Sequence, residues 1–132
     1  MAIHGEWYQV PGATCAALAS LRTIAPRELP DEYYQLLSHS NGGEGPLPVE
    51  PQYFVLYPAE DAASPEQLSL YQQMAPGMFV IGDNGGGEIF AFDLRSDSAP
   101  WPVVCFDPID PKGSILLIAE SFKAFVALVG RE

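Results

Sequence analysis

Basic residues are scarce in this sequence, and their scarcity excludes several classes of partner. The 132 residues include 6 lysines and arginines against 17 aspartates and glutamates, a formal net charge of −11. Between Glu44 and Asp110, eleven acidic residues accompany a single basic one, Arg95. Nucleic-acid backbones and anionic lipids are bound through Lys and Arg, so we expect neither a nucleic-acid partner nor a membrane surface. An acidic surface favours a basic partner, or it serves solubility alone.

Cysteine and histidine are equally sparse, with two of each. A domain of this length buries enough surface to fold without disulfides. Cys15 and Cys105 lie among apolar neighbours, so we expect two reduced thiols in the core. His4 and His39 belong to no H-E-x-x-H motif and the chain has no C-x-x-C, which leaves a zinc site without ligands. We expect His4 near a mobile terminus and His39 at a helix end.

Long apolar runs are also missing. No stretch of eighteen apolar residues occurs, which argues against a transmembrane helix. The N-terminus has no basic stretch followed by an apolar one, so we expect no signal peptide and a cytoplasmic protein. The length and the 48% apolar content predict one globular domain over residues 1–132.

Catalytic motifs are absent as well. The chain has no G-x-S-x-G elbow and no G-x-x-x-x-G-K-[ST] loop. Residues 82–87 do not form a dinucleotide loop, because such a loop opens a helix and these residues lead into a strand-like run. A calcium loop built on Asp83, Asn84 and Glu88 departs from the D-x-[DN]-x-[DN]-G spacing. We therefore predict no enzymatic activity, no cofactor and no metal.

The glycine-rich stretch at 82–88 is the most informative one that is present. Apolar runs at 78–81 and 89–92 flank it, and Asn-Gly and Gly-Gly steps between such runs predict a β-hairpin. Glycine suits the turn because it has no Cβ to clash at positive φ. Asp83, Asn84 and Glu88 form a polar tip that is a candidate for partner contact, and Asp83→Ala is expected to spare the fold. Gly86→Val is expected to impair folding, and the hairpin glycines expected to be structural are Gly82, Gly85, Gly86 and Gly87.

Further helices and strands surround the hairpin. Helices are predicted over 13–22, from Pro30 to residue 40, from Pro65 to residue 75, and from about residue 119 to 129. Ser64 is expected to cap the third, and Asn41 and Gly42 to end the second with a left-handed cap. Strands are predicted at 53–57 and 101–106, a Pro- and Glu-rich loop at 44–52, and either a strand or the approach to a helix at 115–118. This order predicts an α+β domain with helices on one face of the sheet.

Most aromatic residues are expected in the core. Trp101 follows a polar turn and is expected to be partly exposed, which makes it a candidate contact. Seven others recur at the spacing of buried positions: Tyr33, Tyr34, Phe79, Phe90, Phe92, Phe122 and Phe125.

Three segments together resemble the SUKH superfamily. Residues 29–37, followed by Ser-Asn-Gly-Gly-Glu-Gly at 40–45, are similar to its helix-to-Asn-Gly segment. Residues 79–83, Gly-Gly-Glu at 86–88 and Phe-Ala-Phe-Asp at 90–93 resemble its central hairpin. Ile-Ala-Glu-Ser-Phe at 118–122 with Phe125 resembles its closing helix. The resemblance spans about residues 13–129 and implies a single α+β domain, with an antiparallel or mixed sheet and no catalytic residues.

The resemblance also implies a protein-binding role. Many bacterial members are immunity proteins that bind and block a toxin, often a nuclease, and a fungal branch regulates cell-wall assembly through protein contacts. We therefore expect an acidic surface that binds a basic toxin domain. A regulatory interaction domain without a toxin and a small-ligand binder stay open, and so does the oligomeric state. The candidate contact residues are Asp83, Asn84, Glu88, Glu44, Asp97 and Trp101.

Overall fold

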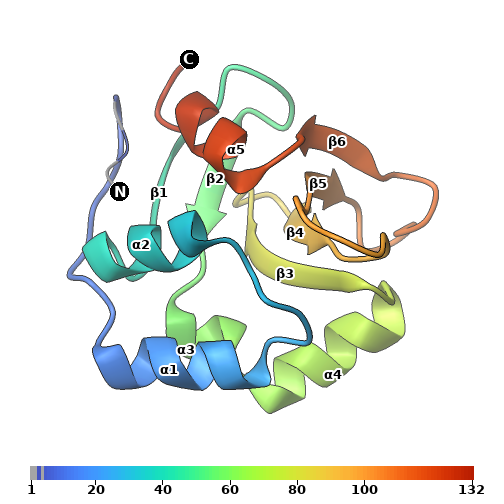
Figure 1. The fold of residues 1–132 in the computed structure, drawn as a ribbon. Helices are drawn as coiled ribbons and strands as arrows, with labels where there is room; N and C mark the ends of the chain where they lie inside the picture. The colour runs from blue at the N-terminus through green and yellow to red at the C-terminus, as the bar shows by residue number, and fades with distance from the viewer. Residues whose placement is uncertain (1–2, 4) are drawn as a thin grey trace.

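An antiparallel sheet in simple chain order organises the fold. The computed structural model describes residue 3 and residues 5–132. Within them six strands lie in the order β1-β2-β3-β4-β5-β6, each antiparallel to its neighbours. The strands are β1 Gly43–Pro46, β2 Tyr53–Leu56, β3 Met78–Asp83, β4 Ile89–Asp93, β5 Val103–Phe106 and β6 Leu116–Ala119. The helices are α1 Cys15–Ile24, α2 Asp31–His39, α3 Ala59–Ala62, α4 Pro65–Met74 and α5 Phe122–Leu128 (Figure 1). The predicted α+β class, the antiparallel sheet and the central β3–β4 hairpin are confirmed.

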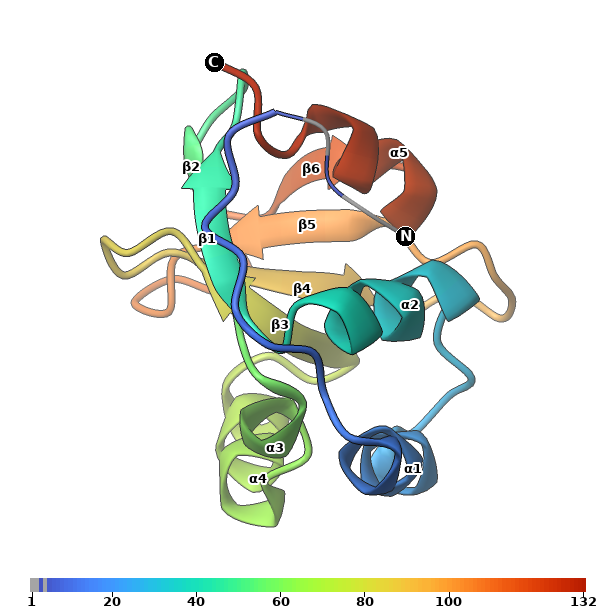
Figure 2. The same cartoon turned by 90° about the vertical axis from the view of Figure 1, so that its left-hand side faces the viewer.

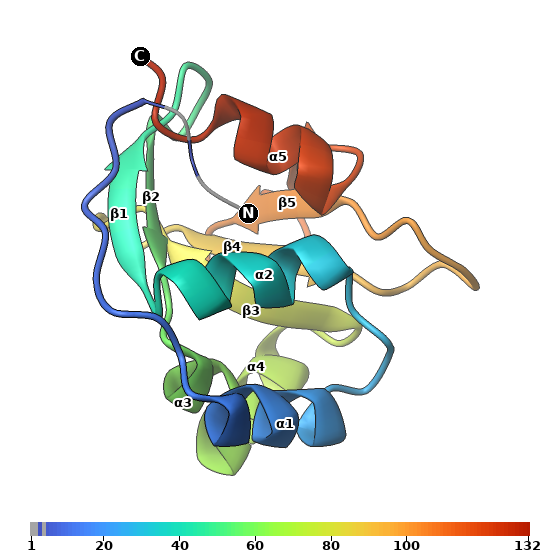
Figure 3. The same ribbon diagram turned by 60° about the vertical axis from the view of Figure 1, so that its left-hand side comes forward.

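The main core lies on one face of the sheet, which we call the inner face. α2 and α5 pass across this face (Figure 3), and α1 and α3 also contribute buried residues to it. Phe54 meets Phe90 and Phe125 edge to face, with ring centroids 5.0 and 4.8 Å apart. The seven aromatic residues predicted in the core are at most 4% exposed, which confirms that prediction. Each such ring stabilises the fold by about 1.5–3 kcal/mol relative to leaving it in water.

The opposite, outer face is covered over its central strands by α4. Tyr71 and Met74 of this helix pack on a second buried cluster from β3, β4 and β5. Strands buried on both faces have unbroken apolar sequences, which explains the runs that flank the hairpin. The other helices contribute to the inner core, as expected for helices on one face of the sheet. α4 adds to this arrangement by covering part of the opposite face. The strand residues of the outer cluster are Met78, Val80, Ile89, Ala91, Val104 and Phe106.

The stretch expected to be a Pro- and Glu-rich loop begins within β1, so that expectation is wrong for residues 44–46, whereas residues 47–52 form no helix or strand, as expected. β1 holds two glycines, Gly43 and Gly45, and glycine weakens a strand signal. Both glycines make room for Trp7: a Cβ at either position would lie 2.9 and 3.0 Å from its ring, respectively. Trp7 in turn stacks on Phe54 at a centroid distance of 6.3 Å. The glycines that hide this strand in the sequence are therefore the ones that let the N-terminal segment pack on the core.

The end of α2 also differs from its prediction. Ser40 closes the helix in an extended conformation, and the positive φ of +113° belongs to Gly42, two residues later. The side chain of Asn41 accepts a hydrogen bond from Ala59 N–H at 2.7 Å and donates one to Glu60 Oε1 at 2.8 Å. Asn41 therefore ties the end of α2 to the first turn of α3, a helix of four residues that was not predicted. The left-handed cap expected at Asn41 is wrong.

Other helix and strand boundaries follow local capping. α4 begins at Pro65 as predicted, and Ser64 Oγ accepts the Gln67 N–H at 3.4 Å. The ambiguous stretch at 115–118 is largely the edge strand β6, so α5 begins later than expected, after a cap by Ser121. β5 begins at Val103 instead of Trp101.

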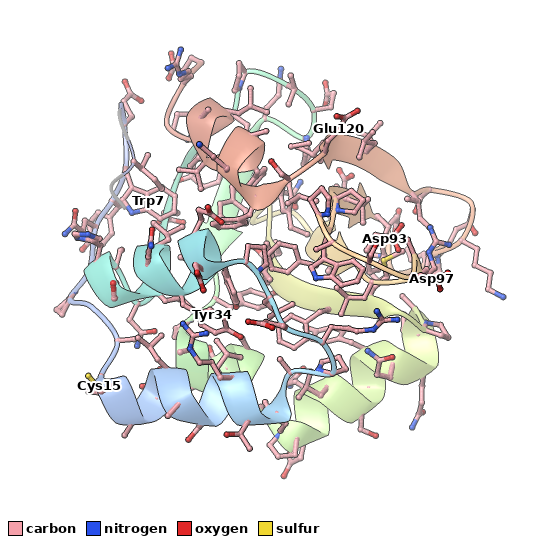
Figure 4. All side chains as sticks on the ribbon, in the orientation of Figure 1. Trp7, Cys15, Tyr34, Asp93, Asp97 and Glu120 are labelled. Carbon is pink, nitrogen blue, oxygen red and sulfur yellow. The ribbon has the colours of Figure 1, made fainter. Side chains whose placement is uncertain are left out.

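The two cysteines lie in different environments. Cys105 is 1% exposed in β5, as expected. Cys15 is exposed in the first turn of α1 (Figure 4), so the prediction of a buried thiol there is wrong. His39 is the last residue of α2, as predicted, and His4 lies outside the described residues.

Candidate functional site

A row of side chains crosses the outer face of the sheet beside the turn of the β3–β4 hairpin. Strand pairing places Tyr8, Glu44, Val55 and Asp83 next to one another on the N-terminal segment, β1, β2 and β3. Directly paired residues of antiparallel strands project from the same face. Asp83 pairs onward with Ile89, which belongs to the outer cluster and so identifies the face. The row brings two predicted contact residues, Glu44 and Asp83, onto one surface.

Two tyrosines flank this row along β2. Tyr53 and Tyr57 stand two residues on either side of Val55 and therefore share its face, whereas the alternating residues Phe54 and Leu56 point the other way and are buried. Tyr57 follows β2 directly, and its N–H continues the ladder by donating to Ile81 O at 3.0 Å. Tyr8 is 70% exposed and Tyr53 is 37% exposed. We call this surface the tyrosine face: Tyr8, Glu44, Tyr53, Val55, Tyr57 and Asp83.

Asp83 is held in place by two hydrogen bonds. Its Oδ2 accepts the Tyr57 hydroxyl at 2.8 Å, and its Oδ1 accepts the Gly85 N–H at 2.8 Å. Burial, and then the bond to Asp83, raise the pKa of Tyr57, so the phenol stays neutral and keeps donating. Asp83→Ala would remove both bonds, so we expect the variant to be less stable than the native protein. The position at a hairpin tip, taken from the sequence alone, predicts no loss of stability.

Glu44 has a similar relation to Tyr53. Burial, and then the neighbouring Glu44 carboxylate, raise the pKa of Tyr53. Tyr53 and Glu44 are both at least partly accessible; Glu44 belongs to the row and Tyr53 lies beside it. The tyrosine face therefore repeats one element at both of its ends, a neutral phenol next to a carboxylate.

Two hollows open on the tyrosine face, one at each tyrosine of β2. The β1 groove, of about 550 Å³, is lined by Tyr8, Glu44 and Tyr53 together with Glu6, Trp7 and Glu132. The α4 pocket, of about 380 Å³, lies between Tyr57 and the α3–α4 segment. Neither hollow has a lysine, arginine or histidine among the described residues that line it. Both hollows therefore offer aromatic rings and acidic groups to a ligand.

The other residues of the hairpin tip do not join this surface. Asn84 Oδ1 accepts the N–H groups of Gly86 at 2.8 Å and of Glu88 at 3.0 Å, so its side chain closes the turn. Glu88 lies toward the inner face, where its Oε2 is 3.7 Å from Cys105 Sγ. Burial, and then this carboxylate, raise the pKa of the Cys105 thiol to about 12, which keeps it protonated. Asn84 and Glu88 thus have roles within the fold.

The hairpin glycines also differ from one another in the physical reason for which each is needed. Gly85 and Gly87 have positive φ values of +76° and +103°, as a turn of this kind requires. Gly82 is needed for space instead, because a Cβ there would collide with the Val55 carbonyl oxygen. Gly86 has no positive φ, and the nearest atoms to an added Cβ lie 3.5 Å away. The backbone reason given for Gly86→Val is therefore wrong.

Asp97 and Trp101 lie at the other end of the sheet, in the loop between β4 and β5. Figure 4 shows Asp97 close to Asp93 and far from Trp7. Trp101 is 4% exposed, its Nε1 donates to Glu28 O at 3.0 Å, and the Arg27 guanidinium lies 5.2 Å from its ring centre. The expected exposure of Trp101 is wrong, and this pair does not belong to the tyrosine face.

The tyrosines themselves were not among the predicted contact residues. The signal for Tyr53 and Tyr57 is the alternation in β2, where they occupy one face and Phe54 and Leu56 the other. Tyrosine with its polar hydroxyl suits the half-exposed side of such a strand. Tyr8 carries no comparable signal, because its place depends on a bridge to Glu44 across 36 residues of chain.

Among the described residues, no group of three or more His, Cys, Asp or Glu side chains is arranged to hold a metal ion. The helices of the described chain are all too short or too polar to cross a bilayer.

Comparison with known proteins identifies the family. No curated protein matches the chain. The sequence model of the SMI1 / KNR4 family (SUKH-1) matches residues 12–128, which confirms the resemblance found in the sequence. Members of this family are typically non-enzymatic immunity or regulatory proteins, and membership is consistent with a protein-binding role. The chain belongs to the SMI1 / KNR4 family (SUKH-1).

Proposed function

We propose that this protein is an immunity protein that binds and neutralises a basic, nuclease-type toxin through the tyrosine face. The observation that carries the proposal is that Glu44 and Asp83 share one surface with partly exposed tyrosines, and that no described residue lining its hollows is basic. Nucleases need a basic surface to hold their substrate, so an acidic surface that fits it also blocks it. In this proposal the protein acts in the cytoplasm and has no catalytic activity of its own.

The composition of the face suits protein recognition. Tyrosine offers a large contact area with little loss of side-chain entropy, and it is enriched in binding surfaces for that reason. The acidic residues act mainly on the encounter, because unlike charges steer association and set its salt dependence. Tyr57 and Asp83 are already held together at 2.8 Å, so this part of the face is ordered before a partner arrives.

The direct test uses the toxin encoded by the neighbouring gene. The two proteins are expected to co-purify, and the toxin should lose its nuclease activity in their complex. The association rate should fall steeply as salt is raised. If the proteins do not bind and the toxin stays active, the immunity proposal fails, and a regulatory role without a toxin becomes the better reading.

Charge-neutral variants locate the surface. Glu44→Gln keeps the shape of the tyrosine face and removes one charge. Asp97→Asn removes the same charge at the far end of the sheet and serves as the matched control. We expect Glu44→Gln to slow association and Asp97→Asn to leave it unchanged; equal effects would show that only net charge matters.

A further inference from the structure

We propose that the α4 pocket is a receptor for a single arginine side chain of the protein partner. The pocket lies where β2 meets the α3–α4 segment, which Figure 2 shows packed together below the sheet. Its described lining residues are Tyr57, Asp61, Ser64, Gln67 and Tyr71. The identity of the partner rests on the proposed function, but the chemistry of the occupant follows from the pocket itself.

The pocket holds two groups that can only accept hydrogen bonds, Tyr57 and Asp61, while Ser64, Gln67 and Tyr71 can each donate or accept. Tyr57 has one hydroxyl proton, and it is committed to Asp83 Oδ2 at 2.8 Å. The Tyr57 oxygen can therefore only accept a bond from a ligand. Asp61 adds a carboxylate, which when ionised accepts and does not donate. Within residue 3 and residues 5–132, the Asp61 side chain takes part in no hydrogen bond and no ion pair of the fold.

The two accept-only groups, Tyr57 and Asp61, favour a ligand that donates hydrogen bonds. A guanidinium group has five N–H donors and no acceptor, and its flat face stacks on aromatic rings. Tyr57 and Tyr71 line the pocket and supply aromatic rings for such stacking. A carboxylate or phosphate ligand would face Asp61 and Asp83 with no cation between them.

Among the residues that the structure describes, no basic side chain lines this pocket. Arg95 is the only basic residue between Glu44 and Asp110, and its guanidinium is engaged with Asp93 at 2.9 Å. That ion pair lies at the other end of the hairpin. The volume of about 380 Å³ falls at the small end of the range for ligand pockets, which fits one side chain better than a folded segment.

The test is a titration of the isotope-labelled protein with Nα-acetyl-L-arginine methylamide, followed by NMR. Shifts are expected at Tyr57, Gln67 and Tyr71, with a dissociation constant of about 1–10 mM for so small a probe. Nα-acetyl-L-citrulline methylamide has the same shape without the charge, and it should bind at least ~5-fold more weakly. Equal binding of the two probes, or shifts elsewhere on the protein, would overturn the assignment.

Two variants connect the shifts to the pocket. Asp61→Asn removes the charge from an exposed helix position and should weaken arginine binding ~3- to 10-fold, whereas the matched change Asp97→Asn should not. Gln67→Lys places a resident ammonium at the pocket and should abolish binding. Undiminished binding to Gln67→Lys would contradict the proposal.

The toxin experiment separates this inference from the proposed function. If the toxin binds and Asp61→Asn leaves its affinity and dissociation rate unchanged, the arginine receptor fails and the immunity role stands. If the arginine probe binds the pocket and no toxin binds, the pocket chemistry stands and the immunity role fails.

Discussion

The central hairpin has an aspartate at the end of each strand, and the side chains of the two aspartates bond to different kinds of group. Asp83 ends β3 and Asp93 ends β4. Each carboxylate accepts the N–H of the residue two positions later, Gly85 at 2.8 Å and Arg95 at 3.1 Å. The Arg95 side chain then donates two bonds of 2.9 Å to Asp93, whereas Asp83 receives the neutral Tyr57 hydroxyl.

This difference decides which of the two carboxylates keeps an uncompensated charge. Arg95 lowers the pKa of Asp93 through its hydrogen bonds and neutralises its charge within the fold. Tyr57 orients the Asp83 carboxylate without neutralising it, so the charge stays available on the tyrosine face. Equivalent turn chemistry thus gives a closed ion pair at one end of the hairpin and an open acidic surface at the other.

The largest expected effect comes from the glycine beside Asp83. Gly82→Ala would force a Cβ against the Val55 carbonyl and separate β2 from β3, which disrupts the Asp83 end of the sheet. We expect a loss of about 2–4 kcal/mol in unfolding free energy, measured by urea denaturation. Gly86→Ala is the matched control and should change stability by under ~1 kcal/mol, because its Cβ has ordinary contacts. Similar losses for both would contradict the distinction between the two glycines.

The next effect isolates the bond that makes Asp83 differ from Asp93. Tyr57→Phe keeps the ring and removes the hydroxyl donor, so Asp83 retains only its bond to Gly85 within the fold. We expect a loss of about 1.5–3 kcal/mol, as is usual for a hydrogen bond to a charged group. Thermal unfolding of Tyr57→Phe beside Tyr53→Phe provides the comparison, and an unchanged Tyr57→Phe would show that the bond to Asp83 adds nothing.

The ion pair at the other end predicts a dependence on pH. The pKa of Asp93 is lowered in the fold, so its contribution to stability is present above the unfolded pKa and is lost as the pH falls through the folded one. Arg95 is half-exposed, so we expect about 0.5–1 kcal/mol at most. Urea denaturation between about pH 6 and pH 2 measures it. Asp93→Asn should flatten part of this dependence, and an unaltered profile would contradict the assignment.

Local sequence patterns predicted the structural features that depend on residues adjacent in the chain. The hairpin, the buried aromatic spacing and the Ser64–Pro65 helix start are each set by a few adjacent residues, and each is found as predicted. The strand β1 was not predicted, because its glycines make room for Trp7, a residue more than thirty positions away. The helix α3 was not predicted, because four residues are too few to show a helical periodicity.

Which residues meet in the candidate site depends on the register of the strands, and the sequence does not show that register. Glu44 and Asp83 were proposed from the sequence as acidic contact residues, and only strand pairing places them in one row with Tyr8 and Val55. Trp101 was misplaced for a related reason. It is covered by Arg27 and bonds to the Glu28 carbonyl, more than seventy positions before it.

The smallest expected effect tests the comparison through binding. Asp83→Asn keeps an oxygen that can accept the Tyr57 hydroxyl and removes only the charge, and Asp93→Asn removes the same charge at the other end of the hairpin. If the tyrosine face meets a basic toxin, Asp83→Asn should slow association by about 2- to 3-fold at low salt and lose its effect at high salt. Asp93→Asn should leave the association rate nearly unchanged, because Arg95 already neutralises that carboxylate. Stopped-flow or surface-plasmon measurements with the toxin from the neighbouring gene give both rates. A larger effect of Asp93→Asn would place the contact at the opposite end of the sheet and remove the tyrosine face from the proposal.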